Sequence, residues 1–183
     1  TLLGIGYVRR VRAAEVDAFV DAARRDGAPE YPLPDPAGRD DLALILYNEP
    51  TQTLRSSWGF DLLTVPNAAK ALAGAEATGR PTISDRLVLA IDMARPPAER
   101  PAGHVVYAPI YAAKAPLTTA ADRREALVGW ANVPFRAADL LAQVRVPAGL
   151  QLTLDDGAGP IARFWYITLP MLNPTVVVII VLS

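Results

Sequence analysis

Cysteine is missing from the 183-residue sequence and histidine occurs once, as His104, which removes several kinds of site from consideration. Without cysteine the chain has no disulfide, no thiolate ligand for a metal and no cysteine nucleophile. Zinc sites use about three or four protein ligands, so a lone histidine on a strand-like run predicts no metal centre. No cofactor is predicted either, because neither G-x-G-x-x-G after a strand nor G-x-x-x-x-G-K-[ST] occurs.

Catalytic signatures are missing as well. The chain contains no G-x-S-x-G nucleophile elbow and no H-E-x-x-H motif. A Ser-His-Asp triad would have to use His104, and no serine has the setting of a nucleophile. We therefore expect no catalytic residue and no enzymatic activity.

The charge of the chain is balanced, with 18 basic and 19 acidic residues and a formal net charge of −1. No long block of like charges is present, so the sequence lacks the electrostatic footprint of a nucleic-acid-binding protein. Hydrophobic residues make up 51% of the chain, enough for one ordinary domain with a core. The chain starts at Thr1 without a basic segment or a signal-like apolar run, and we interpret it as a fragment of a longer protein.

The first 150 residues alternate between strand-like and helix-like segments. Strand-like runs cover 2–8, which we expect to end at Arg9, and 42–47, 81–84, 104–111, 129–135 and 150–154; helix-like runs cover 13–23, 66–78, 120–127 and 137–144. Proline-rich loops separate some of them, and Pro109 predicts a sheet edge or a bulge. Strands outnumber helices without a strict βαβ rhythm, so the predicted fold class is α+β.

The helix-like segment 66–78 has clear ends. Thr64 is a candidate N-cap, Pro66 suits the first turn, and Gly79 can adopt the left-handed conformation that ends a helix. Its many alanines predict close packing against a neighbouring element. Asp61, just upstream, invites a functional interpretation, but we expect it to fix the turn.

Six short blocks in the sequence resemble, in order, the CHASE family of extracytoplasmic sensor domains, over about residues 4–154. They are GIGYVRRVRAAEVDAFVDAARRDG, LYNEP, WGFD, ATGRPTIS, VVYAPIY and DRREALVGW…FRAADLL. The resemblance implies PAS-like α+β units on a helical stalk outside the membrane, which signal to histidine kinases or nucleotide cyclases inside. The stalk would precede Thr1 and could carry a homodimer contact, and the parent protein would supply the membrane anchor.

The resemblance also implies a small-molecule pocket, walled by helix 66–78 and the strands that begin near Pro81 and His104. On this basis the candidate ligand-binding residues are Ser84, Leu87, Tyr107, Trp130 and Val133. An alternative remains for three of them: Leu87 and Val133 could be ordinary core, and Trp130 could fill the face of the sheet. A buried Tyr107 hydroxyl would need a partner, which a ligand could supply.

The identity of the ligand is narrowed by one departure from the family. Cytokinin receptors of plants place an aspartate where this chain has Ala68, which cannot accept a hydrogen bond from an adenine amino group. Loss of such a buried contact costs about 1–3 kcal/mol, which disfavours an adenine-type ligand. Arg123 and Arg124 lie on an exposed-looking helix, where surface ion pairs are more common than ligand clamps.

The C-terminal segment, residues 155–183, differs in character from the rest. Gly157, Ile167, Leu169 and Pro170 match the spacing of the EAA-loop region of sugar-type ABC transporter permeases, which contacts the ATPase subunit, although residues 151–153 do not match its E-A-A positions. This resemblance predicts a junction near residue 155.

The segment does not form a complete membrane span, because Pro170, Asn173 and Pro174 interrupt its apolar run. Two alternatives therefore remain open. The segment could be a buried terminal strand of the sensor domain, or the whole chain could be part of a permease subunit that carries a soluble insertion.

Overall fold

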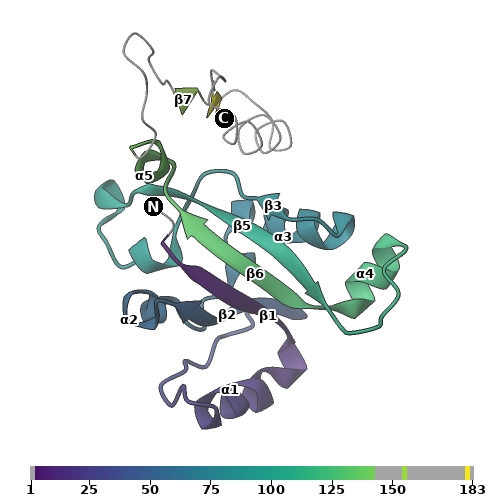
Figure 1. The fold of residues 1–183 in the computed structure, drawn as a ribbon. Helices are drawn as coiled ribbons and strands as arrows, with labels where there is room; N and C mark the ends of the chain where they lie inside the picture. The colour runs from purple at the N-terminus through teal and green to yellow at the C-terminus, as the bar shows by residue number, and fades with distance from the viewer. Residues whose placement is uncertain (1–2, 143–153, 156–179, 182–183) are drawn as a thin grey trace.

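A computed structural model describes residues 3–142, 154–155 and 180–181 of the chain. Its centre is an antiparallel sheet with the strand order β2-β1-β6-β5-β3, in which β4 pairs with β5 alongside β3 (Figure 1). The strands are β1 (Ile5–Arg12), β2 (Asp41–Glu49), β3 (Thr82–Ile83), β4 (Leu87–Val88), β5 (Ala102–Tyr111) and β6 (Leu127–Phe135). This curled sheet with a few flanking helices is consistent with a PAS-like sensor fold, and the predicted α+β class is confirmed.

Helices flank the sheet and connect its strands. The α-helices are α1 (Val16–Arg25), α2 (Thr51–Leu54), α3 (Pro66–Thr78), α4 (Ala120–Ala126) and α5 (Ala137–Leu141), and the 3-10 turns are η1 (Ala13–Glu15), η2 (Arg55–Ser57), η3 (Leu62–Thr64), η4 (Ala90–Asp92) and η5 (Pro97–Glu99). In Figure 1, α3 lies behind the sheet and α1 lies below β2. Two short strands outside this sheet, β7 (Leu154–Asp155) and β8 (Ile180–Val181), pair in parallel with each other.

The edge of the sheet formed by β2 is covered on both faces. Leu42 and Leu44 pack with α1, whereas Ala43 and Ile45 belong to the larger cluster that contains α3. Alternate residues of a strand point to opposite faces, so an uninterrupted apolar run is what a strand buried on both sides requires. The strand predicted at 42–47 is confirmed; Leu42 to Ile45 are buried, whereas Leu46 is only partly buried and Tyr47 is exposed.

Helix α3 packs closely against β5, as its alanine content predicts. Its buried residues are Ala68, Ala71, Leu72 and Ala75, which recur at helical spacing on one face. Gly79 ends the helix with φ 69°, in the left-handed region that a side chain disfavours.

The prediction that Thr64 is the N-cap of α3 is wrong. Val65 occupies the N-cap position without a side-chain hydrogen bond, and Thr64 belongs to η3, where its Oγ1 donates to the Asp61 carbonyl at 2.6 Å. Because the η3 turn runs directly into α3, the capping side chain acts one turn earlier. Asp61 caps η3 by accepting from the Leu63 backbone N–H at 3.0 Å.

The first strand begins at Ile5 instead of residue 2 and continues past its predicted end, because Arg9 and Arg10 do not end it. Both lie within β1, and Arg10 forms an ion pair with Asp41 on the neighbouring strand at 2.8 Å. A charged side chain is compatible with a strand when it lies at a face or edge that reaches water.

The prediction for Pro109 is confirmed. Among the described residues, the pairing of β5 with β3 ends at Tyr107, and the β5–β6 register shifts between Ile110 and Tyr111. Pro109 therefore lies where β5 is free on one side, next to an irregularity, and its missing N–H breaks no pairing with β3.

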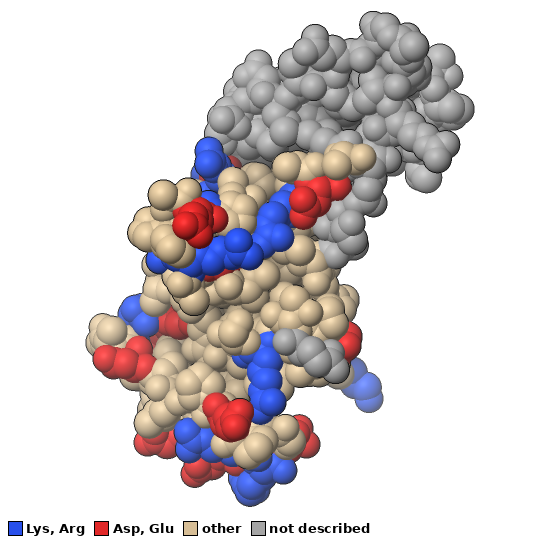
Figure 2. All heavy atoms as spheres, turned by 90° about the vertical axis from the view of Figure 1, so that its left-hand side faces the viewer, with Lys and Arg blue, Asp and Glu red and all other residues tan. Residues whose placement is uncertain are grey.

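Charged side chains are intermixed on the part of the surface seen in Figure 2. Acidic and basic residues gather together at the lower end, where α1 lies, and the middle of this face is largely uncharged. No extended area of one sign is visible on this face.

Candidate ligand-binding cavity

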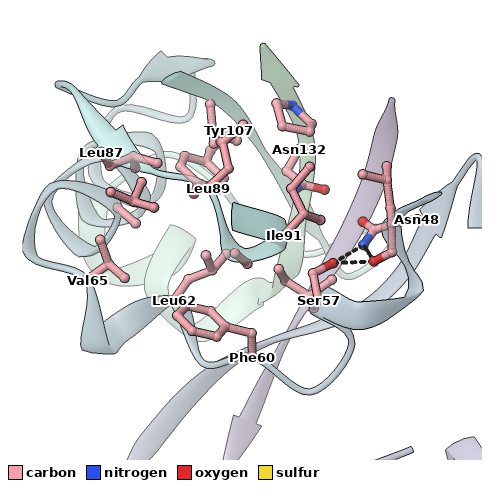
Figure 3. Close-up of a pocket in the computed structure, with 17 residues that line it drawn as sticks. Asn48, Ser57, Phe60, Leu62, Val65, Leu87, Leu89, Ile91, Tyr107 and Asn132 are labelled. Atoms are coloured by element: carbon pink, nitrogen blue, oxygen red, sulfur yellow. Dashed lines mark hydrogen bonds between the residues drawn. The ribbon is translucent and has the colours of Figure 1, made fainter. Parts of the chain in front are cut away.

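A cavity lies between α3, the segment from β4 to η4, and the face of the sheet that α3 covers (Figure 3). Its volume is ≈ 500 Å³ when counted out to its mouth, and ≈ 40 Å³ of this is wide enough for the centre of a water-sized sphere. It is therefore narrow. The lining residues are Ile45, Asn48, Leu54, Ser57, Phe60, Leu62, Val65, Ala68, Leu87, Val88, Leu89, Ala90, Ile91, Val105, Tyr107, Asn132 and Pro134.

Three polar residues of the lining belong to one row across the sheet. The row is set by strand register, in which Asn48 lies opposite Gly6, Gly6 opposite Asn132, and Asn132 opposite Tyr107. Residues directly opposite one another on antiparallel strands project from the same face. The sheet therefore places the side chains of Asn48, Asn132 and Tyr107 together on the cavity side, with Asn132 between the other two in Figure 3.

The absence of a side chain at Gly6 leaves space for the carboxamide groups of Asn48 and Asn132. A Cβ atom at this position would collide with Oδ1 of Asn48 and with Oδ1 of Asn132. Glycine is thus required here by close approach. Both side-chain oxygens lie over the space that its missing side chain leaves.

Asn48 is held by the turn that follows β2. Its Nδ2 donates to Ser57 Oγ at 2.6 Å and to the Leu54 carbonyl at 3.3 Å, and Ser57 Oγ donates to the same carbonyl at 2.6 Å. The nitrogen of the carboxamide is committed to these partners, so the oxygen faces Gly6. Asn48 is therefore oriented by its own network.

Tyr107 and Asn132 lack such partners. Both residues are buried, with exposed fractions of 0% and 5%. Within the described part of the chain, the Tyr107 hydroxyl and Asn132 Oδ1 have no hydrogen-bond partner. Burial raises the pKa of the Tyr107 hydroxyl above its ordinary value, so it stays protonated. Buried polar groups are nearly always hydrogen-bonded, and two of the exceptions among the described residues belong to side chains that line this cavity.

Two of the five predicted ligand-binding residues, Leu87 and Tyr107, line the cavity. Trp130 is on the same face of the sheet but packs in the core cluster with Val8, away from the cavity lining. Val133 lies opposite Val106, one residue from Asn132, so its side chain points to the other face.

Ser84, the remaining predicted ligand residue, is also outside the lining. It is buried, and its Oγ accepts from the Val105 backbone N–H at 3.0 Å. The Ser84 carbonyl lies 3.2 Å from Nδ1 of His104, whose ring stacks on Phe135. Ser84 and His104 thus join the end of β3 to β5.

The sequence prediction missed Asn48, Ser57 and Asn132. Asn132 offered a signal, since it is an amide in an otherwise apolar strand, two residues from Trp130 on the same face. Asn48 precedes Glu49 and Pro50 and is easily interpreted as a turn residue.

The wall formed by α3 is apolar. It contributes Val65 and Ala68 to the lining, and Ala68 is fully buried. No hydrogen-bonding side chain reaches the cavity from the described residues of this helix. Among the described lining residues, the polar side chains therefore come from the sheet and the turns beside it.

The segment from β4 to η4 is anchored by an ion pair. Asp92 follows the lining residues Ala90 and Ile91, is 1% exposed, and pairs with Arg136 at 2.7 Å and with Arg95 at 2.9 Å. Arg136 lies between the end of β6 and the start of α5. The cavity wall is thus tied to the point where the chain leaves the sheet.

Asp61 and the two arginines of α4, Arg123 and Arg124, make structural contacts outside the cavity lining. Asp61 accepts from the Ala43 and Leu63 backbone N–H groups and pairs with Arg39 at 2.7 Å, so the prediction that it fixes the turn is confirmed. Arg123 donates to the Ala77 carbonyl at the end of α3 and does not line the cavity. Arg124 is a surface residue 3.9 Å from Glu76.

A family model described as the CHASE domain matches residues 1–165. The chain belongs to the CHASE domain family. CHASE domains are extracytoplasmic sensor modules of receptors such as histidine kinases, and they are not catalytic. No curated protein matches the chain.

The match extends past the junction predicted near residue 155, and nothing in the comparisons supports the permease resemblance. The permease-like positions Gly157, Ile167, Leu169 and Pro170 lie outside the described residues, so that resemblance stays a prediction. Within the described ranges, no helix combines the length and apolar character needed to cross a membrane.

Proposed function

We propose that this CHASE domain binds a small molecule in the cavity between α3 and the sheet, and reports its presence to the rest of a membrane receptor of the histidine kinase or nucleotide cyclase type. The observation that carries the proposal is the pairing of an apolar cavity with two buried polar groups that lack partners, Tyr107 and Asn132. Binding sites for small molecules are typically apolar with a few convergent polar groups.

The signal would be a shift in population between two packings of the domain. A ligand that contacts both α3 and the β4–η4 segment favours the packing in which these two walls are closed on it. The Asp92–Arg136 ion pair connects one of these walls to the exit of β6. In the full receptor, the stalk and a homodimer formed through it would carry this bias across the membrane.

The proposal is tested by blocking the cavity. Ala68→Met introduces a long apolar side chain into the lining, whereas Ala73→Met places the same side chain at an exposed position of the same helix. Binding of toluene and of a panel of small neutral, acidic and basic compounds is measured by ligand-observed NMR and by the shift in unfolding midpoint. A compound at 100 times its Kd stabilises the folded state by about 2.7 kcal/mol.

We expect at least one compound to bind the wild-type chain and the Ala73→Met variant equally, and to lose binding to Ala68→Met. Equal binding to both variants would place the ligand elsewhere. The absence of any binding to the wild-type chain would contradict the proposal.

A further inference from the structure

The cavity is lined without charge. None of its lining residues is acidic or basic, and its walls are mostly aliphatic side chains together with Phe60 and Tyr107. An ionised group transferred from water into such surroundings loses its hydration and gains no opposite charge. A ligand held here in an ionised form would therefore bind weakly, which favours an uncharged ligand.

The cavity lining includes two buried polar atoms without a partner among the described residues, the acceptor Asn132 Oδ1 and the Tyr107 hydroxyl. Asn132 Oδ1 can only accept, and it lies near the oxygen of Asn48, whose nitrogen is occupied by Ser57. Two oxygens cannot hydrogen-bond to each other, so Asn132 Oδ1 needs a donor from elsewhere.

Rotation of the Asn132 carboxamide does not remove the need for a hydrogen-bond donor. If the group turns over, its nitrogen can donate to Asn48 Oδ1, and its oxygen then faces the apolar cavity instead. In both orientations an oxygen of this pair has no donor among the described protein groups, and an N–H or O–H of a ligand can supply one. The Tyr107 hydroxyl, directly opposite on β5, can accept from the same ligand group or donate to it.

We infer that the cavity recognises an uncharged, mostly apolar compound through an N–H or O–H donor that binds Asn132 Oδ1, with the Tyr107 hydroxyl beside it. This inference rests on the proposed function and identifies the class of ligand for that site. Asn132 is then the residue that determines specificity. The donor is recognised from the sheet, opposite the apolar wall formed by Ala68 of α3 and by its N-cap residue Val65.

The test uses five matched probes and the full chain. Benzamide is uncharged and carries N–H donors, N,N-dimethylbenzamide is uncharged without a donor, benzoate is an anion, benzylammonium is a cation, and toluene is apolar. Their affinities are measured by ligand-observed NMR titration for the wild-type chain and for Asn132→Leu and Asn132→Asp. A buried hydrogen bond to the amide makes benzamide bind about tenfold or more tightly than the other four probes.

The two variants are expected to change this order in different ways. Asn132→Leu removes the acceptor, so benzamide falls to the affinity of toluene. Asn132→Asp places a carboxylate at the same position, so benzylammonium gains about tenfold or more and becomes the preferred probe. A reversal of preference of this kind requires that residue 132 contacts the probe, which a purely structural role would not produce.

The failure of this inference is distinguishable from failure of the proposed function. If toluene and benzamide bind the wild-type chain equally, or benzoate binds best, the cavity is a ligand site but the donor preference is wrong. If Asn132→Leu retains the wild-type order of affinities, Asn132 does not set specificity. If none of the probes binds, toluene included, the cavity does not accept ligands and both proposals are wrong.

Discussion

Tyr107 on β5 lies directly opposite Asn132 on β6, and each residue presents a buried polar atom that has no partner among the described residues. Two such atoms reduce the stability of the folded domain, since each lost its water on folding. A sequence selected for stability alone would place apolar side chains here. The row therefore has the character of a site in which stability is given up for recognition.

Replacing Tyr107 by phenylalanine should raise the free energy of unfolding of the ligand-free chain by about 1 kcal/mol, because the variant removes an unpaired buried hydroxyl and keeps the ring. Tyr31→Phe is the matched control. The Tyr31 hydroxyl is equally buried but donates to the Ile45 carbonyl at 2.9 Å, so its removal should cost about 1 kcal/mol. Chemical denaturation of the two variants measures these opposite signs.

If Tyr107→Phe and Tyr31→Phe lose stability equally, the interpretation that the Tyr107 hydroxyl is unpaired is contradicted. The Tyr107 hydroxyl would then have a partner in the ligand-free protein, such as an ordered water. The inference that the Tyr107 hydroxyl needs a hydrogen-bond partner from a ligand would then no longer hold.

Stability should fall at alkaline pH, and Tyr107 should contribute to the fall. Burial raises the pKa values of Tyr107 and Tyr31 above their ordinary value of 10.0, and for Tyr31 a hydrogen bond from Gly59 opposes part of the rise. The unfolded chain therefore loses these protons first. Their contribution is complete below about pH 10 and is lost as the pH rises toward the folded-state pKa values, by about 1.4 kcal/mol per pH unit for each tyrosine.

Denaturation curves between about pH 9 and about pH 11 measure this slope. Tyr107→Phe should reduce the slope by the share of one tyrosine, and the double variant with Tyr31→Phe should reduce it by two. An unchanged slope in Tyr107→Phe would mean that its hydroxyl ionises as readily in the folded chain as in the unfolded one.

Gly6→Ala should destabilise the domain and disturb the cavity. The new Cβ collides with the side-chain oxygens of Asn48 and Asn132 and approaches the Tyr47 carbonyl, and strand backbone cannot yield easily between two partners. We expect a loss of about 2 kcal/mol or more. Gly74→Ala is the matched control, because its Cβ would be 3.5 Å from the nearest atom of Thr82 and lies within α3.

Alanine is a better helix former than glycine, so Gly74→Ala should instead stabilise by about 0.5–1 kcal/mol. Thermal or chemical unfolding of the pair distinguishes the two positions. If Gly6→Ala is tolerated without loss, the two carboxamides do not depend on the space beside Gly6.

Much of the fold follows from local patterns in the sequence. The limits of α3 were predictable because Pro66 and Gly79 act through their own backbone preferences. The strand at 42–47 was predictable because its residues form an unbroken apolar run, of which Leu42 to Ile45 are buried. Arg9 and Arg10 led to a wrong strand end. Charged residues on an accessible part of a strand resemble the start of a loop when the neighbouring strand is not known.

The cavity was only partly predictable, for a reason that lies in the pairing of strands. Leu87 and Tyr107 were identified through family resemblance, but the position of Asn132 depends on the β5–β6 register. That register is set across a connection that contains α4, without a tight turn to fix it locally. The sequence therefore predicts Val133 as a ligand-binding residue, whereas its neighbour Asn132 is the one that lines the cavity.

The ion pair between Asp92 and Arg136 should be one of the larger single contributions to stability. Asp92 is 1% exposed, and the Arg136 side chain is 20% exposed. Removing one partner leaves the other charge with little water to hydrate it, so Asp92→Ala should cost about 3 kcal/mol. The exposed pair of Arg55 and Glu30 is the control, and Glu30→Ala should cost less than about 1 kcal/mol.

A second substitution of Asp92, to asparagine, reports on coupling between the cavity and the exit of β6. Asp92 follows two lining residues of η4, whereas Arg136 precedes α5, so a ligand that orders η4 also orders this ion pair. Hydrogen exchange of the backbone N–H groups at the start of α5 should slow when toluene or benzamide occupies the cavity of the wild-type chain. In Asp92→Asn, which keeps the size of the side chain but not its charge, that slowing should disappear while binding persists. If α5 is protected equally in the variant, the signal leaves the cavity by another route.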